Sequence, residues 1–318
     1  GANTVAGGTF DVEETTDGMT IAAAGIATNG GLIDLETEAA DQTMTLEGSV
    51  QSNQTSADGA NITLTADRMD LDGAANNAGG INAGAQGRVT LVSVTATDAI
   101  DLGSATDAAA DTLELSGNEL TGITSEHLIV GNANTAGITF SADVSAANVA
   151  DTVHLYSATG AAAGAVDGTA GGLTANNLAV TATDHVIMSS GNNVTNLAVN
   201  ATGANVTFVE ADGLSITEVN DEVNPEAGIR GRNITVQVTP GADGNITVQR
   251  GIVATGFVLL EATGSITQEA GIATVTTGTT AGEDDITYTA NSDNTGGGAI
   301  VMQADSAVET AGGDGDDI

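Results

Sequence analysis

The sequence of 318 residues predicts an all-β protein that folds as a right-handed parallel β-helix, a β-solenoid. Three observations lead to this prediction. Short runs of alternating apolar and polar residues follow one another along the chain, equivalent runs recur with a period of roughly 27–32 residues, and aromatic side chains are nearly absent. The alternative fold is an antiparallel sandwich repeated two or three times, which would need no common inward frame at this period.

The alternating runs are the first observation. Alternation over four to six residues is typical of a half-buried strand. The runs AIDLGS, TLELSG and LTGIT follow one another between residues 99 and 124, and Gly, Asn and Asp, which favour turns, bound such runs. The Ala-rich segment 161–172 is interrupted by Gly too often to form a stable helix. We therefore expect about three strands per coil and no long helix.

The spacing of the runs is the second observation. One apolar residue in each of six similar phrases is expected to point inward: Met69, Ile100, Leu128, Leu155, Val186 and Leu214. Coils of a parallel β-helix stack about 4.8 Å apart, so that equivalent residues form ladders. The phrase VTATD, at 94–98 and again at 180–184, is interpreted as a corner between two strands. Residues 1–318 are expected to form a single β-solenoid segment, with a less certain frame between 218 and 285.

Composition is the third observation, and it also excludes several functions. Aromatic residues make up 2% of the chain and Trp is absent, which suits a narrow bore filled by Val, Ile, Leu and Ala. The formal net charge is -37, from 42 acidic residues against five Arg and no Lys, and such a field repels nucleic acids and anionic membranes. No stretch of 18 apolar residues occurs, so we expect no membrane insertion. The absence of Cys excludes disulfides and thiol catalysis.

Three segments carry a resemblance to a known family: GANITLTADRMDLDG (59–73), INAGAQGRVTLVSVTATDAIDLGS (81–104) and ATGFVLLEATGSITQEAGI (254–272). They resemble the repeats of filamentous-haemagglutinin-like exoproteins, which are secreted β-helical adhesins of the two-partner-secretion and autotransporter types. The resemblance implies an extracellular or cell-surface location and a structural role as a segment of an adhesin or fibre stalk. It also implies surface glycans of a host or a neighbouring cell as partners. No segment is similar to the secretion domain of that family.

Two other function classes stay open. The chain could be a subunit of a self-assembling extracellular filament or sheath, because neither end has the pattern of a cap and open coil ends would stack. We therefore expect the solenoid to continue beyond both ends, in the same chain or in another subunit. The third class is a calcium- or carbohydrate-binding surface module. An enzyme is not expected, because the chain has no Lys, few aromatic residues to stack on a sugar and no known catalytic motif.

Candidate site residues are few, and none is predicted to be catalytic or to bind an organic cofactor. The three histidines each precede an inward residue, so they could stack as a column that holds a metal ion or responds to pH, or they could be simple corner residues: His127, His154 and His185. Calcium is the one cofactor considered. Its candidate ligands lie in acidic clusters, which are otherwise solvated surface charge: Asp284, Asp285, Asp314, Asp316 and Asp317, with Asp70–Asp72 as a further cluster. Finally, Arg230, Arg232 and Arg250 either form a small basic spot or offset local acidic charge.

Overall fold

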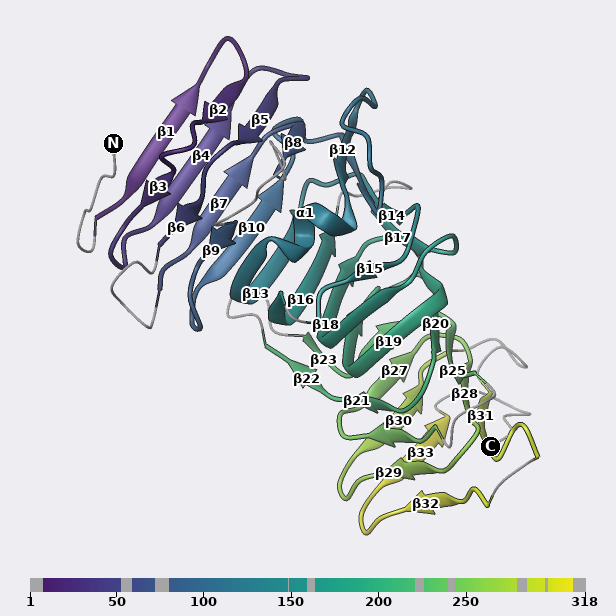
Figure 1. The fold of residues 1–318 in the computed structure, drawn as a ribbon. Coiled ribbons are helices and arrows are strands. Elements are labelled where there is room, and N and C mark those ends of the chain that lie inside the picture. Colours follow the sequence, from purple (N-terminus) through teal and green to yellow (C-terminus); the bar gives the residue numbers. More distant parts are fainter. Residues whose placement is uncertain are drawn as a thin grey trace. The chain divides into compact units, whose positions relative to one another are not determined.

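The computed structural model is almost entirely β-structure (Figure 1). It describes residues 8–52, 59–71, 80–147, 149–158, 164–220, 226–239, 244–278, 285–294 and 297–310. The chain divides into two compact units, Gly1–Thr159 and Gly160–Ile318, which are described in turn. Nearly all strand pairs within each unit are parallel, so the predicted parallel β-helix is confirmed.

The first unit stacks its longest strands in one column. The strands of this column are β1 (Phe10–Glu14), β4 (Ile33–Thr37), β7 (Ile62–Thr65), β10 (Arg88–Val92), β13 (Ile123–Asn132) and β16 (Ala150–Ser157), and each pairs in parallel with the next. Two aliphatic ladders run through it. One consists of Ile33, Ile62, Val89, Leu128 and Val153, and the other of Leu35, Leu64, Leu91, Val130 and Leu155. All ten side chains are buried, so the ladders form the core.

Shorter strands complete the coils of the first unit. One set comprises β2 (Met19–Ile21), β5 (Thr43–Leu46) and β8 (Arg68–Asp70), and another comprises β3 (Ile26–Ala27), β6 (Val50–Gln51) and β9 (Ile81–Asn82). The start of β13 continues the latter set, because Ile123 pairs with Ile81. β15 (Val144–Ser145) follows later in the chain. Each complete coil therefore uses three strands, as expected from the sequence.

An insertion lengthens one coil of this unit. β11 (Ala99–Leu102) pairs with β14 (Gly137–Phe140) on one side and with β12 (Thr112–Leu115) on the other. α1 (Gly117–Thr121), the one helix of the described residues, follows β12. Because the insertion lies between β10 and β13, the register partners Val89 and Leu128 are unusually far apart in the sequence.

The second unit repeats the three-strand design. The strands of its first column are β17 (Ala165–Gly168), the start of β19 (Val186–Asn200), β20 (Val206–Glu210), β25 (Ile234–Val238), β28 (Val258–Ala262) and β31 (Ile286–Ala290). Their inward ladder consists of Val166, Val186, Val206, Ile234, Val258 and Ile286, all buried. Such uniform β-branched rungs explain why the core needs almost no aromatic side chains.

Two further columns close the coils of the second unit. One contains β18 (Leu173–Ala182), the later part of β19, β21 (Leu214–Ile216), β26 (Ile246–Val248), β29 (Ile266–Gln268) and β32 (Ile300–Met302). The other runs from the end of β19 through β24 (Ile229–Gly231), β27 (Ile252–Ala254), β30 (Ala273–Thr276) and β33 (Ala307–Thr310). A small antiparallel pair, β22 (Glu218–Val219) and β23 (Glu226–Ala227), lies outside these columns.

Buried polar side chains mark the bend of β19. The register shifts between Met188 and Asn192, and the fully buried Asn192 amide donates to the carbonyl oxygens of Met188 and Val209 at 2.9 and 3.1 Å. The carboxylate of Glu210, also fully buried, accepts the backbone N–H of Val194 at 3.0 Å. Burial nevertheless raises the pKa of Glu210 to about 7. These side chains replace the backbone partners that the bend removes.

The predicted inward residues point inward, but they do not form one ladder. Met69, Ile100, Leu128, Leu155, Val186 and Leu214 are all buried. However, Leu128 pairs with Val153, and Leu155 pairs with Val130. The sequence separation of register partners also varies, being short for Leu178 and Leu197 and long for Val89 and Leu128. Coil length therefore varies more than the sequence pattern indicates.

The outer face of the first column changes character along the unit. On β1 and β4, Asp11 lies opposite Asp34 and Glu13 lies opposite Glu36, whereas β7 continues these positions with Thr63 and Thr65. Like charges directly opposite each other on neighbouring strands repel. Burial and the Asp11 charge raise the pKa of Asp34.

Within the described residues, no helix has the length and apolarity that a bilayer crossing requires.

Candidate functional site

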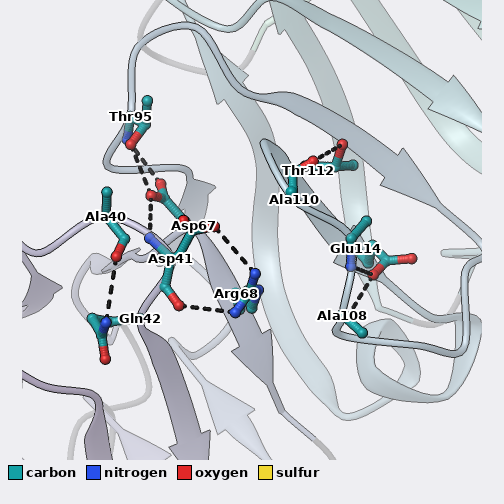
Figure 2. Close-up of polar contacts among 11 residues, drawn as sticks. Ala40, Asp41, Gln42, Asp67, Arg68, Thr95, Ala108, Ala110, Thr112 and Glu114 are labelled. Carbon is teal, nitrogen blue, oxygen red and sulfur yellow. Dashed lines mark hydrogen bonds and ion pairs between the residues drawn. The ribbon is translucent and has the colours of Figure 1, made fainter.

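Polar side chains gather at the corners of three successive coils of the first unit (Figure 2). Asp67, between β7 and β8, accepts hydrogen bonds from the backbone N–H and the hydroxyl of Thr95, both at 2.8 Å, and from the backbone N–H of Asp41 at 3.0 Å. Arg68 donates to the side chain of Asp41 at 3.1 Å and to its carbonyl oxygen at 3.0 Å. Asp67 is only 3% exposed, so it joins three corners as a buried acceptor.

Asp98 shares this corner and is 2% exposed. Burial, followed by the charge of Asp67 and a side-chain hydrogen bond with Asp67, raises the pKa of Asp98 to about 6. Its Oδ1 is buried without a hydrogen-bond partner among the described residues. Because Asp67 and Asp98 are both buried, a dissolved substrate does not reach them, and the pair is suited to a structural role.

The phrase VTATD supplies two members of this corner. Its first copy, 94–98, lies between β10 and β11, and its second copy, 180–184, covers the end of β18 and the turn before β19. The corner interpretation is therefore confirmed in each unit. The contacts differ, because Thr95 donates to Asp67 whereas the hydroxyl of Thr181 donates to Glu226 at 2.8 Å.

Glu114 organises the insertion between β11 and α1 (Figure 2). Its carboxylate accepts the hydroxyls of Ser104 and Thr106 at 2.5 and 2.8 Å, and the backbone N–H groups of Ala108 and Ala109, both at 2.8 Å. Burial alone would raise the pKa of Glu114, but these hydrogen bonds outweigh burial and lower it. With four donors, this carboxylate has no free position for a ligand.

A third acidic group has the ligand spacing of a cation site. One carboxylate oxygen from each of Asp70, Asp107 and Glu119 lies within 4.8 Å of the other two. Glu119 reaches this position because it closes a capping box with Ser116 at the start of α1, while its Oε1 accepts the N–H of Leu71 at 3.0 Å. Burial, with the Asp107 charge as a lesser contribution, raises the pKa of Glu119 to about 7. A proton or a hard divalent cation would relieve the repulsion within this group.

The predicted histidine column does not form in the first unit. His127 pairs with Thr152 and His154 pairs with Ile129, so the two side chains do not share a register position. The physical reason is that the step from β13 to β16 is shorter than the predicted frame, since Leu128 stacks on Val153 and not on Leu155. His154 instead stacks on Tyr156 with ring centroids 5.3 Å apart. His185 belongs to the second unit, where its Nδ1 lies 3.3 Å from Asp184.

Most predicted calcium ligands lie outside the described residues: Asp284, Asp314, Asp316 and Asp317. Asp285 is described and half-buried, and its carbonyl oxygen accepts the N–H of Val258 at 2.8 Å. Of the predicted cluster Asp70–Asp72, Asp70 belongs to the group with Asp107 and Glu119, and Asp72 lies outside the described residues. Sequence reasoning missed the two partners of Asp70, although the capping-box pattern of Ser116 and Glu119 was a usable signal.

The three candidate arginines do not act alike. Arg250 forms an ion pair with Glu218 at 2.9 Å and so offsets local acidic charge. Arg230 and Arg232 are exposed.

Comparisons with models of protein families, with curated proteins and with solved structures find no match to this chain.

Proposed function

We propose that the chain is a structural, non-catalytic segment of a secreted cell-surface adhesin or fibre stalk. The observation that carries this proposal is the coil-on-coil architecture, in which each inward rung is covered by the next. The polar clusters of the described residues support it, because Asp67, Asp98, Glu114 and Glu210 serve to join corners and bends. A stalk needs a long, regular core rather than a binding or catalytic site, and the buried polar groups named above serve that core.

The last described coil favours continued stacking. Ile300 pairs with the fully buried Ile266, so it faces inward, yet it is 49% exposed. It lines an open apolar pocket of about 380 Å³ together with Ile286, Tyr288, Met302 and Val308. Within the described residues, no further strand covers this rung. Another coil would bury these side chains, at about 25 cal/mol per Å² of apolar surface removed from water.

The covering coil could come from the same chain or from another subunit. The first case is the stalk, and the second is the alternative function, a self-assembling filament or sheath. Electron microscopy of the native material, with the density traced past this rung, separates them. Continuous density within one chain supports the stalk, and chain breaks at regular intervals support the filament. Isolated compact particles with this rung facing solvent would contradict both.

Calcium binding is a second candidate function, and the Asp70, Asp107 and Glu119 group favours it. The test compares the melting temperature in calcium with that in chelator, for the native chain and for Glu119→Gln. A calcium-dependent increase that Glu119→Gln abolishes supports the site. An increase that persists in this variant places the calcium elsewhere, and an unchanged melting temperature removes calcium from the proposal.

A further inference from the structure

A polar pocket lies on the second unit, where three successive corners stack. Its volume is about 460 Å³, and its walls come from the turn before β19, the turn before β20 and the turn before β25. The residues that line it are Thr183, Asp184, His185, Ile187, Gly203, Ala204, Asn205, Thr207 and Arg232. Ile187 and Thr207 are register partners on β19 and β20, so rigid strands place both side chains.

The sequence hollows this pocket at its middle corner. Gly203 has a φ of +86°, and a Cβ at this position would meet no other atom within 4 Å. Ala204 follows with the smallest side chain. The corner before it carries His185, and the corner after it carries Arg232. Because small residues lie between two corners with long side chains, the pocket is open to solvent on one side, and it is called the bay.

Three side chains that line the bay carry hydrogen-bonding groups that the fold does not use. The backbone of Arg232 is fixed, because its N–H donates to the carbonyl of Ala204 at 2.6 Å. Among the described residues, no hydrogen bond or ion pair joins the side chains of Asn205, Thr207 or Arg232 to another group. Asp184 accepts the backbone N–H of His185 at 2.7 Å and lies beside its ring. The bay therefore offers a guanidinium, an imidazole, an amide, a hydroxyl and a carboxylate.

The unpaired guanidinium indicates the kind of ligand. The chain has 42 acidic residues and only five Arg, so cationic side chains are scarce on it. Arg68 and Arg250 form ion pairs with Asp41 and Glu218. Among the described residues no ion pair joins Arg88, Arg230 or Arg232 to a carboxylate, and of these three only Arg232 lines the bay. Arg binds a carboxylate through two parallel hydrogen bonds, which makes an anionic group its natural partner.

We propose that this bay binds an acidic sugar, with the sugar carboxylate on Arg232 and the ring hydroxyls on Asp184, Asn205 and Thr207. Carboxylate and amide side chains suit hydroxyl groups, since each can accept from one hydroxyl and the amide can also donate to the next. The sugar class follows from this combination of one cationic group with several neutral or acceptor groups. The binding site itself does not depend on the proposed function. Only the source of the sugar, a cell surface, rests on the proposed role as a surface stalk.

Calorimetric titration of the purified chain with uronic-acid trisaccharides tests the site. The probes are the trimers of galacturonate, glucuronate and mannuronate, each with the neutral hexose trimer of the same ring stereochemistry. We expect at least one acidic trimer to bind more tightly than its neutral counterpart. Arg232→Gln should weaken that binding about tenfold or more, as loss of a charge-assisted bidentate contact does.

Arg230→Gln is the matched control, because it removes the same charge from an exposed side chain that does not line the bay. It should leave the affinity unchanged, and circular dichroism verifies that both variants fold. Equal affinity for acidic and neutral trimers, equal losses in both variants, or no binding of any trimer would overturn the site. None of these results affects the stalk proposal, which the chain tracing tests separately.

Discussion

Replacing Asp98 by Asn should stabilise the protein at neutral pH, although the side chain is buried. The folded protein holds the pKa of this carboxyl at about 6, against an ordinary value of 3.8. At 1.36 kcal/mol per pKa unit, ionised Asp98 costs the folded state about 3 kcal/mol above pH 6. Asn has the same size, carries no charge and can donate to Asp67, so it removes this cost.

The sign of the pH dependence follows from the raised pKa. Between about pH 4 and 6 the folded state binds more protons than the unfolded state, so the Asp98 contribution to stability is fully present below pH 3.8 and is lost as pH rises through 6. The neighbouring charges that raise this pKa after burial belong to Asp67, Asp111 and Asp41, and all three act in the same direction.

Urea unfolding of the native chain and of Asp98→Asn at pH 4, 6 and 8 measures the effect. The two midpoints should nearly coincide at pH 4, and the variant should gain about 2 to 3 kcal/mol at pH 8. Asp17→Asn, at an exposed carboxylate, is the control and should show no such divergence. A variant less stable than the native chain at pH 8, or a difference that does not change with pH, would refute the reasoning.

Three other features are tested by substitution, two of them with a matched control position, and thermal or urea unfolding measures each effect. Glu114→Gln should lower the free energy of unfolding by about 2 kcal/mol at pH 7, because four donors lose a charged acceptor. The stability difference between the native chain and the variant should vanish as pH falls through the lowered pKa of Glu114. A constant difference down to pH 2 would contradict this account. Gly228→Ala should cost about 3 kcal/mol or more, since the new Cβ would lie 2.0 Å from a backbone oxygen of the next coil. At Gly271, where φ is similar but the space is open, the same change should cost only about 1 kcal/mol. Phe208→Ala, at a fully buried ring, should cost about 3 to 5 kcal/mol, and Phe257→Ala, at a ring 37% exposed, about 0.5 kcal/mol; similar losses at both rings would argue against a core built around Phe208.

The strands and their inward residues could be predicted because alternation is a local property. Each strand shows which of its faces is apolar, whatever lies beside it. Membership of a ladder could not be predicted in the same way, since all three strands of a coil share this alternation. Leu155 shows the difference: it is buried as expected, but it stacks on Val130 and not on Leu128.

The polar clusters depend on which coils stack in which register, so the alternation of apolar and polar residues could not predict them. Asp67 and Asp98 are distant in the sequence and meet only because their corners belong to consecutive coils. Asp70 was singled out as acidic, yet its neighbours Asp107 and Glu119 come from an insertion that the repeat does not foresee. The open bay around Gly203 was missed because its hollow comes from a small corner between two large ones, which becomes visible only once the corners are stacked.

The paired carboxylates of β1 and β4 make the first coils of their unit responsive to the surrounding water. Asp11 and Asp34, like Glu13 and Glu36, lie on strands about 4.8 Å apart. The Debye length is about 30 Å in 0.01 M salt and about 3 Å in 1 M salt, so the repulsion acts in full in dilute water and fades within one coil spacing in brine. The pairing of β1 with β4 should therefore be weaker in fresh water, whereas seawater or a concentrated salt medium should strengthen it. Ionic strength, rather than a ligand, would then set how firmly β1 stays paired with β4.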